Sequence, residues 1–341
     1  YFLMANYPIQ NARKDAVVRE DEIYDWLTAD VNAALCNYAS DPFGFVRKIT
    51  NNVEQYLAFA EGRGNDGQPS IAMDNLRRLS GGAFSLHYVL LLAASTFPKP
   101  LFDHFVTQLE SFLFYYIFTK TPTKELERNF SLWADDLRAI AAEPDAGPQK
   151  ERLNCFIAER FQTSMQAKEA ELSDAMKRYS LHTMQQYRTR YLLAKLSQFV
   201  DMAYKGLRES GSLEDYAKLE IEHILPDNPK AELRAEFAAQ NPQANYDEYK
   251  NKLGNLTLLE KPINIVASND FFADKKQEYA KCKSYLTSSI AGLTEVGKNS
   301  SITRINEKLA SFDNWTADAI DRRQGLLIGL AREIWKITSL E

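Results

Sequence analysis

The second half of the chain carries two ionisable residues side by side, Glu222 and His223, within the apolar segment LEIEHILPDNP. Two asparagines follow, Asn255 and Asn264, in the segment KLGNLTLLEKPIN. Ionisable side chains in a strand-like segment need polar partners or water, so such a pair indicates a function. A histidine can deprotonate water near neutral pH, and oxygen ligands suit a hard divalent cation. These residues together predict metal-assisted hydrolysis of a phosphodiester.

That reaction gives each residue a part. It requires a base, a cation that neutralises developing charge, and a group that holds the base in one orientation. His223 is the predicted base, because the other histidine of the second half lies at a long helix expected at about 176–205. Glu222 and Asn264 offer oxygen ligands suited to Mg²⁺ or Mn²⁺ rather than Zn²⁺. Neighbours on a strand face opposite sides, so Glu222 and His223 share one site only where the strand twists or ends.

Each residue also has a purely structural interpretation. A Glu-His pair on a strand occurs by chance, and Gly254-Asn255 is a common turn dipeptide. Asn264 or Asn269 could cap a helix. The combined order and spacing of these residues is far more specific than any one of them, and it favours the nuclease interpretation.

Local patterns predict the elements that position these residues. The segment YAKLEIEHILP alternates apolar and polar residues and ends at Pro226, as a short strand does. Gly254-Asn255 then forms a turn that leads into a second strand, LTLL. The segment from Asn264 to about Tyr285 is expected to be irregular or helical. Strand, turn, strand and helix form a ββα unit, expected at about 216–285.

Further residues extend this pattern towards the end of the chain. The full set is EHILP at 222–226, LGNLTLL at 253–259, Asn264, Ser268-Asn269, Phe272 with Lys275, and Trp315, Ile320, Arg323 and Trp335. Over about 176–341 this pattern resembles the C-terminal domain of the GmrSD-type modification-dependent restriction endonucleases, a branch of the HNH (ββα-metal) nuclease superfamily. The resemblance implies an HNH-like fold and a DNA endonuclease or nickase that uses one divalent metal.

The resemblance also implies a role for each motif residue. His223 would be the general base and Glu222 a metal ligand, while Asn255 would fix the loop and orient the base. Asn264 would be the second metal ligand. The remaining residues, Ser268, Asn269, Lys275 and Arg323, would contact phosphate or support the fold, and a structural ion pair is an equal alternative for Arg323. The chain lacks the CxxC pair of some HNH enzymes, so no zinc site is expected.

Residues 1–172 are expected to form a helical connector or scaffold domain, followed by an HNH-like nuclease domain at 173–341. Helical spacing recurs in segments at about 16–37, 42–61, 71–79, 84–95, 99–119, 123–142 and 148–171. The stretch FVTQLESFLFYYIF at 105–118 is apolar nearly all round, which predicts a central helix. The predicted fold class is mostly α, with an N-terminal helical bundle and then a helical domain containing a small ββα-metal core.

Composition and missing motifs narrow the function classes. No GxxxxGK[ST] or GxGxxG loop occurs, so no nucleotide site is expected in this chain. The three cysteines lie far apart, which supports neither a disulfide framework nor a zinc knuckle and favours a reducing cytoplasm. No apolar run reaches the roughly 20 residues of a membrane span. The acidic excess behind the net charge of -5 lies entirely in residues 1–170, so DNA is expected to contact the second half.

The first residue is Tyr1, and the chain is expected to be a fragment of a longer protein. The resemblance implies a missing N-terminal ParB-like domain that uses nucleotide hydrolysis and senses DNA modification. The chain would then be the effector part of a cytoplasmic antiphage restriction system, with DNA as its partner, and a homo-oligomer is compatible with the sequence. Two function classes stay open: a metal-dependent DNA endonuclease or nickase, and a catalytically weak DNA-binding or assembly module of a larger defence protein.

Overall fold

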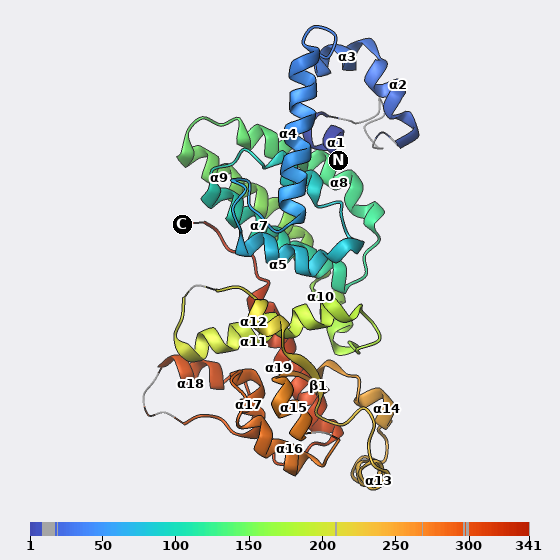
Figure 1. The fold of residues 1–341 in the computed structure, drawn as a ribbon, viewed down its shortest axis with the longest axis vertical. Helices are drawn as coiled ribbons and strands as arrows, with labels where there is room; N and C mark the ends of the chain where they lie inside the picture. Colours follow the sequence, from blue (N-terminus) through green and yellow to red (C-terminus); the bar gives the residue numbers. More distant parts are fainter. Residues whose placement is uncertain are drawn as a thin grey trace. The chain divides into compact units, whose positions relative to one another are not determined.

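The computed structural model describes residues 1–8, 18, 20–208, 210–267, 269–295, 297 and 300–340. The described chain is mostly helical and contains one two-stranded sheet, which confirms the mostly α fold class. It divides into two compact units. Unit 1 comprises Tyr1–Glu169 and Ile337–Glu341, and unit 2 comprises Ala170–Lys336. In Figure 1, most of unit 1 runs from blue to green and unit 2 from yellow to red.

The elements of unit 1 are helical. They are α1 (Phe2–Asn6), η1 (Glu20–Glu22), α2 (Ile23–Thr28), α3 (Asp30–Cys36), α4 (Pro42–Ala60), α5 (Ile71–Ser80), η2 (Gly81–Ala83), α6 (Tyr88–Ala93), α7 (Lys99–Phe118), α8 (Thr123–Ala141), α9 (Ala146–Phe156), the π-helical η3 (Ile157–Gln162) and α10 (Thr163–Lys177), which continues into unit 2. The single helix expected at 16–37 is wrong where that segment is described. Ala29 is extended and separates α2 from α3. Neither Gly nor Pro occurs there, so the sequence carries no sign of the break.

Helix α7 forms the core of unit 1. All of its side chains from Gln108 to Phe118 are buried, as the apolar stretch predicted. Phe112 stacks on Phe161 of η3 with 4.8 Å between ring centroids, and it meets the edge of Trp133 of α8 at 5.4 Å. Aromatic packing therefore fixes α7 among its neighbours.

The last described residues also belong to unit 1. Gln108 donates a hydrogen bond to Thr338 Oγ1 and accepts one from Thr338 N, both at 3.0 Å. Asn154 makes a similar pair of bonds with the backbone of Leu340. The expected division at 172/173 assigned this segment to the second domain, whereas the contacts place it in unit 1. The pairing partners lie about 190 to 230 residues away, beyond the reach of any local pattern.

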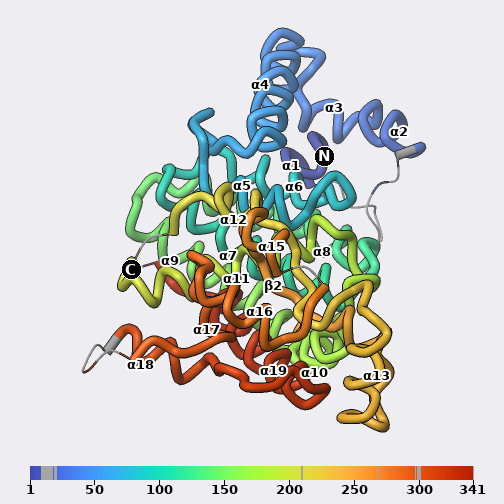
Figure 2. Tube along the Cα trace, turned by 60° about the horizontal axis from the view of Figure 1, so that its bottom comes forward, coloured from blue at the N-terminus to red at the C-terminus, as the bar shows by residue number. Residues whose placement is uncertain are grey.

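Unit 2 places a small antiparallel sheet among helices. Strand β1 (Glu220–His223) pairs with β2 (Leu256–Leu259), and His223 lies opposite Leu256. The other elements are α11 (Gln186–Lys205), α12 (Glu214–Ala217), α13 (Ala231–Gln240), α14 (Tyr246–Tyr249), η4 (Leu253–Asn255), α15 (Lys261–Ala267), α16 (Phe272–Tyr279), α17 (Tyr285–Ala291), α18 (Ser300–Asn306) and α19 (Ala317–Ile334). Helix α15 follows β2 and packs against β1 and α16. Figure 2 shows α15, β2 and α16 close together.

The turn η4 packs directly on α19, and this contact requires a glycine. A Cβ atom added to Gly254 would lie 2.1 Å from the backbone oxygen of Ile320. The Gly254 N–H donates to Oε1 of Gln324 at 3.0 Å. The sequence suggested Gly254 as a turn residue, and the structure adds close approach to a helix as its physical reason.

Candidate active site

The side chains of β1 alternate between two faces, as strand geometry requires. Glu220 and Glu222 share one face, whereas His223 belongs to the other. Both glutamates accept hydrogen bonds from side chains on the helices that follow β2. The strand therefore separates the predicted base from two carboxylates that both lie within three residues of it.

Glu222 is buried and engaged by two side chains of α16. Lys275 Nζ donates to Glu222 Oε1 at 2.6 Å, and the Tyr279 hydroxyl donates to the same oxygen at 2.8 Å. Glu222 is 7% exposed and Lys275 1% exposed, so this is a buried ion pair. Burial lowers the pKa of Lys275, while the carboxylate opposes that shift, and burial raises the pKa of Tyr279 well above its usual value.

Lys275 also reaches the residue predicted to be the base. Its Nζ donates to the backbone oxygen of His223 at 2.8 Å. One ammonium group therefore ties Glu222 to the backbone at the end of β1. Lys275 was expected either to contact phosphate or to support the fold. Its side chain is only 1% exposed and cannot reach a phosphate in this structure, so the contact favours support of the fold.

Asn255 holds the segment that follows His223. Its Oδ1 accepts from Leu225 N at 2.7 Å and from Trp315 Nε1 at 2.8 Å. Its Nδ2 donates to Leu225 O at 2.9 Å and to Lys250 O at 2.7 Å. The side chain is fully buried and all four of these bonds have good lengths. Such a contact set is what a residue that fixes the loop beside the base would need.

Arg323 supports the same turn from α19. Its Nη1 donates to the backbone oxygens of Gly254 and Leu256, at 2.8 and 2.7 Å. The side chain is 3% exposed, and burial lowers its pKa to about 10. Its partners are carbonyl groups, so within the described residues it forms neither the expected ion pair nor a surface for phosphate. The Arg323 guanidinium therefore stabilises the η4 turn.

His223 lies half-buried at the end of β1 with one ring nitrogen unused. Its Nε2 is buried and has no hydrogen-bond partner among the described residues. Burial lowers the pKa of His223, and the nearby Asp227 carboxylate partly opposes the shift. Lys250 donates to Asp227 Oδ1 at 2.9 Å and holds the pKa of that carboxyl below its usual value. The imidazole is therefore held neutral near a carboxylate, in the protonation state that a base requires.

Asn264 lies on α15 and contacts Glu220 rather than Glu222. Its Nδ2 donates to Glu220 Oε2 at 2.7 Å. The expected pair of ligands, Glu222 and Asn264, is therefore not joined by a hydrogen bond in the described structure, whereas Glu220 and Asn264 are. Asn269 is exposed in the turn before α16, and Ser268 lies outside the described residues.

The predicted divalent metal can be tested against these contacts. Glu222 Oε1 already accepts from the Lys275 ammonium, and a second cation at that oxygen would be repelled. Glu220 and Asn264 bring a carboxylate and an amide together, and no described Lys or Arg forms a salt bridge with Glu220. A carboxylate and an amide oxygen suit one hard metal completed by water. The described residues contain no group of three or more His, Cys, Asp or Glu side chains that could hold a metal ion. A site made of one carboxylate and one amide contains only one side chain of these types, so it would not form such a group.

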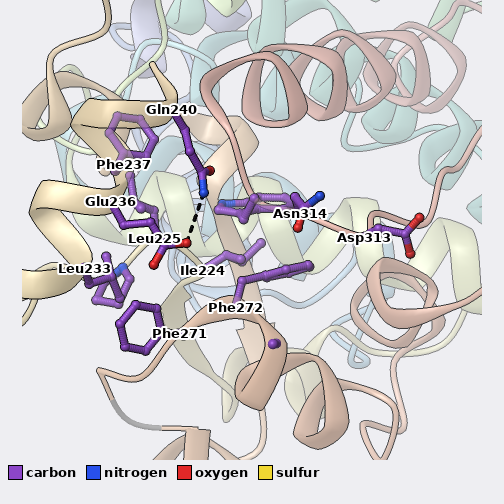
Figure 3. Close-up of a pocket in the computed structure, with 13 residues that line it drawn as sticks. Ile224, Leu225, Leu233, Glu236, Phe237, Gln240, Phe271, Phe272, Asp313 and Asn314 are labelled. Carbon is purple, nitrogen blue, oxygen red and sulfur yellow. Dashed lines mark hydrogen bonds between the residues drawn. The ribbon is translucent and has the colours of Figure 1, made fainter. Parts of the chain in front are cut away.

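A cavity of about 310 Å³ lies beside the segment that follows His223 (Figure 3). Its walls include Ile224, Leu225 and the aromatic rings of Phe272 and Trp315, which stack at 5.2 Å. Its polar residues are exposed, and the dashed line in Figure 3 is the 3.0 Å bond from Gln240 to Glu236. None of the predicted site residues lines this cavity.

Sequence reasoning missed three contributors to this arrangement. Glu220 is two residues before Glu222, so strand alternation could have placed it on the same face. Tyr279 is four residues after Lys275 on one helix face, which is a recognisable spacing. Trp315 belongs to the motif, but its bond to Asn255 joins residues 60 positions apart and has no local signal.

The fold and the site thus define a helical domain with a two-stranded sheet and a histidine clamped at the end of its first strand. Residues 166–330 match the family of GmrSD restriction endonucleases, C-terminal domain. This match supports a GmrSD-type restriction endonuclease C-terminal region at 166–330, as the motif resemblance predicted, and it supports a nuclease role for that region. The matched stretch contains all the candidate site residues. No curated protein matches the chain. Within the described residues, no helix combines the length and hydropathy needed to cross a bilayer.

Proposed function

We propose that residues 166–330 are a metal-dependent DNA endonuclease or nickase of the HNH type, with His223 as general base. The observation that carries this proposal is the Asn255 clamp. Two of its four side-chain bonds hold Leu225, directly after the His223–Ile224 segment, and the other two join Lys250 and Trp315. The family match supplies DNA as the substrate class. A base can act only where its geometry is fixed before the substrate arrives.

His223 would take a proton from the attacking water. Burial lowers the pKa of His223, which favours the neutral ring that a base requires. Protonation during the reaction would create an imidazolium near Asp227, whose negative charge would stabilise it. Lys275 would act as a positioning residue, because it holds the His223 carbonyl rather than the ring.

The proposed metal is Mg²⁺ or Mn²⁺, which when bound would neutralise charge on the phosphodiester and its leaving oxygen. Asn264 is one proposed ligand, as the motif predicted. Glu222 stays the predicted carboxylate, but its bond to Lys275 favours Glu220, which already contacts Asn264. Ligand identity can be separated from catalysis by measuring Mn²⁺ binding directly. Glu220→Gln should weaken Mn²⁺ binding if this preference holds, whereas loss of binding only in Glu222→Gln would restore the original assignment.

The central experiment is nicking of a supercoiled plasmid in Mg²⁺ or Mn²⁺. His223→Ala should abolish nicking while the circular dichroism spectrum and the unfolding transition stay unchanged. His104→Ala is a matched control, because His104 in unit 1 also has a buried Nε2 without a partner among the described residues. Cleavage by His223→Ala at the wild-type rate would exclude His223 as the base.

One observation favours the second function class, a catalytically weak DNA-binding or assembly module. Glu222 and Asn264 are both engaged by other side chains, so a metal would have to displace at least one existing contact. Wild-type protein that binds DNA but cuts it under no divalent metal would support that class. In either case we propose that the region serves a restriction system acting on modified or foreign DNA, with a ParB-like domain elsewhere in the polypeptide.

A further inference from the structure

Helix α4 of unit 1 exposes a regular apolar stripe. Phe43, Val46, Val53 and Leu57 are 80%, 57%, 51% and 54% exposed, and Thr50 between them is also exposed. The steps along this stripe are three, four, three and four residues, which is the spacing of the a and d positions of a coiled coil. We call these five residues the α4 stripe. Scattered exposed apolar residues are common, but a row at heptad spacing along one helix is not.

The stripe is not the face by which α4 packs into unit 1. That face is formed by Phe45, Tyr56 and Phe59, among others. The Tyr56 ring lies 4.6 Å from that of Tyr88, and Phe59 is fully buried against Phe102. Helix α4 therefore has two apolar faces, and only one of them is covered within the described residues. An amphipathic surface helix normally has one.

Two exposed charges border the stripe on the same side. Arg47 and Glu54 are seven residues apart, so they lie along one edge of the helix. Neither forms a salt bridge with another described residue. A partner helix that ran in the opposite direction, with Thr50 at the two-fold axis, would bring Arg47 next to Glu54 of a second copy and Glu54 next to Arg47 of that copy. A parallel partner would instead bring each charge level with its own kind.

We infer that the α4 stripe is a homodimer interface, in which α4 pairs antiparallel with α4 of a second copy of this chain. Phe43 then faces Leu57 of the second copy, Val46 and Val53 alternate along the seam, and both ends carry an Arg47–Glu54 pair. The surface is self-complementary, as a two-fold interface must be. A single pair of helices buries less area than a permanent dimer does, so the dimer dissociates on dilution.

Sedimentation velocity over a range of protein concentrations tests the dimer. The wild-type chain should shift from monomer to dimer as the concentration rises. Val53→Glu should remove the dimer, because it puts a charge in the seam at a position that is exposed in the monomer and tolerates it. Arg63→Glu is the control, since Arg63 is an exposed arginine outside α4. A wild-type chain that is monomeric at all concentrations, as it would be if another protein covers the stripe, overturns the inference, as does a dimer that survives Val53→Glu.

Charge reversal tests the antiparallel register. Arg47→Glu and Glu54→Arg should each weaken dimerisation by about tenfold or more, because like charges then meet at both ends of the seam. The double variant R47E/E54R should restore wild-type dimerisation by recreating both pairs in reverse. Equal dimerisation of the single and double variants would overturn the register. All three variants change exposed residues, and circular dichroism verifies that each one folds.

Discussion

The aromatic cluster around α7 in unit 1 and the polar network around the sheet of unit 2 are held together by different interactions. Around α7, unit 1 buries aromatic rings that need only be packed, such as Phe112 against Phe161 and Trp133. Beneath its sheet, unit 2 buries an ion pair, an amide and a guanidinium, each of which needs specific partners. An apolar core tolerates changes that keep its volume, whereas a buried polar network loses stability when one member changes. In unit 2, this sensitive polar network lies at the candidate site.

The largest loss of stability is expected from removing one charge of the buried ion pair in unit 2. Lys275→Met keeps the volume but leaves Glu222 buried without its cation, which should cost about 3–5 kcal/mol of the free energy of unfolding. Denaturant unfolding followed by circular dichroism measures the loss. The double variant with Glu222→Leu should recover most of it, and a failure to recover would show that Lys275 matters through another contact.

Asn255→Asp is the next most severe change. It replaces the Nδ2 donor with an oxygen that faces the carbonyls of Leu225 and Lys250, in a site that water does not reach. The loss should be about 2–4 kcal/mol at pH 7, since two hydrogen bonds become repulsive contacts. It should shrink at low pH, where the new carboxyl can be protonated and donate. The same unfolding series at pH 5 and pH 7 measures this, and a pH-independent loss would contradict the account.

Phe112→Leu changes the apolar interior of unit 1 and should cost less. Leucine fills most of the ring's space and removes no polar partner, so a loss of about 1–2 kcal/mol is expected. Nicking by the His223 site should be unaffected at temperatures where the variant is folded. A larger stability loss than that of Lys275→Met would reverse the contrast between the two interiors.

The smallest expected effect is the pH dependence of stability that two buried histidines contribute. Complete burial lowers the pKa of His87 in unit 1 to about 3, and partial burial lowers that of His223 in unit 2. Below the unfolded pKa of about 6.5 the unfolded chain binds more protons at each site, so stability falls with decreasing pH. Each contribution is complete above about pH 6.5 and is lost as the pH falls through the folded pKa. NMR titration of the imidazole resonances should show the larger depression at His87.

The sequence predicted the parts of the fold that depend on local patterns. Helices α4, α7 and α8 begin at Pro42, Lys99 and Thr123, where the helical segments were expected to begin, and β1 ends before Pro226 as expected. The α2–α3 break and the return of residues 337–340 to unit 1 depend on tertiary contacts, and no local pattern shows them. For the site, the motif singled out Asn255, and its role in orienting the base stays a prediction that its bonds to Leu225 support. The partner of Glu222 could not be predicted, because the pair joins residues 53 positions apart.

The close approach of Gly254 to α19 has a mechanical consequence. The backbone of η4 touches the helix with no side chain between them, so nothing compressible separates the two. Arg323 and Gln324 pin the same turn, and Asn255 passes the constraint on to Leu225, two residues after His223. Each contact in the series from α19 to the segment after His223 is direct. A shift of α19 along its axis is therefore transmitted to the histidine. A ligand or a bend that moves α19 would therefore shift the alignment of His223, the proposed base.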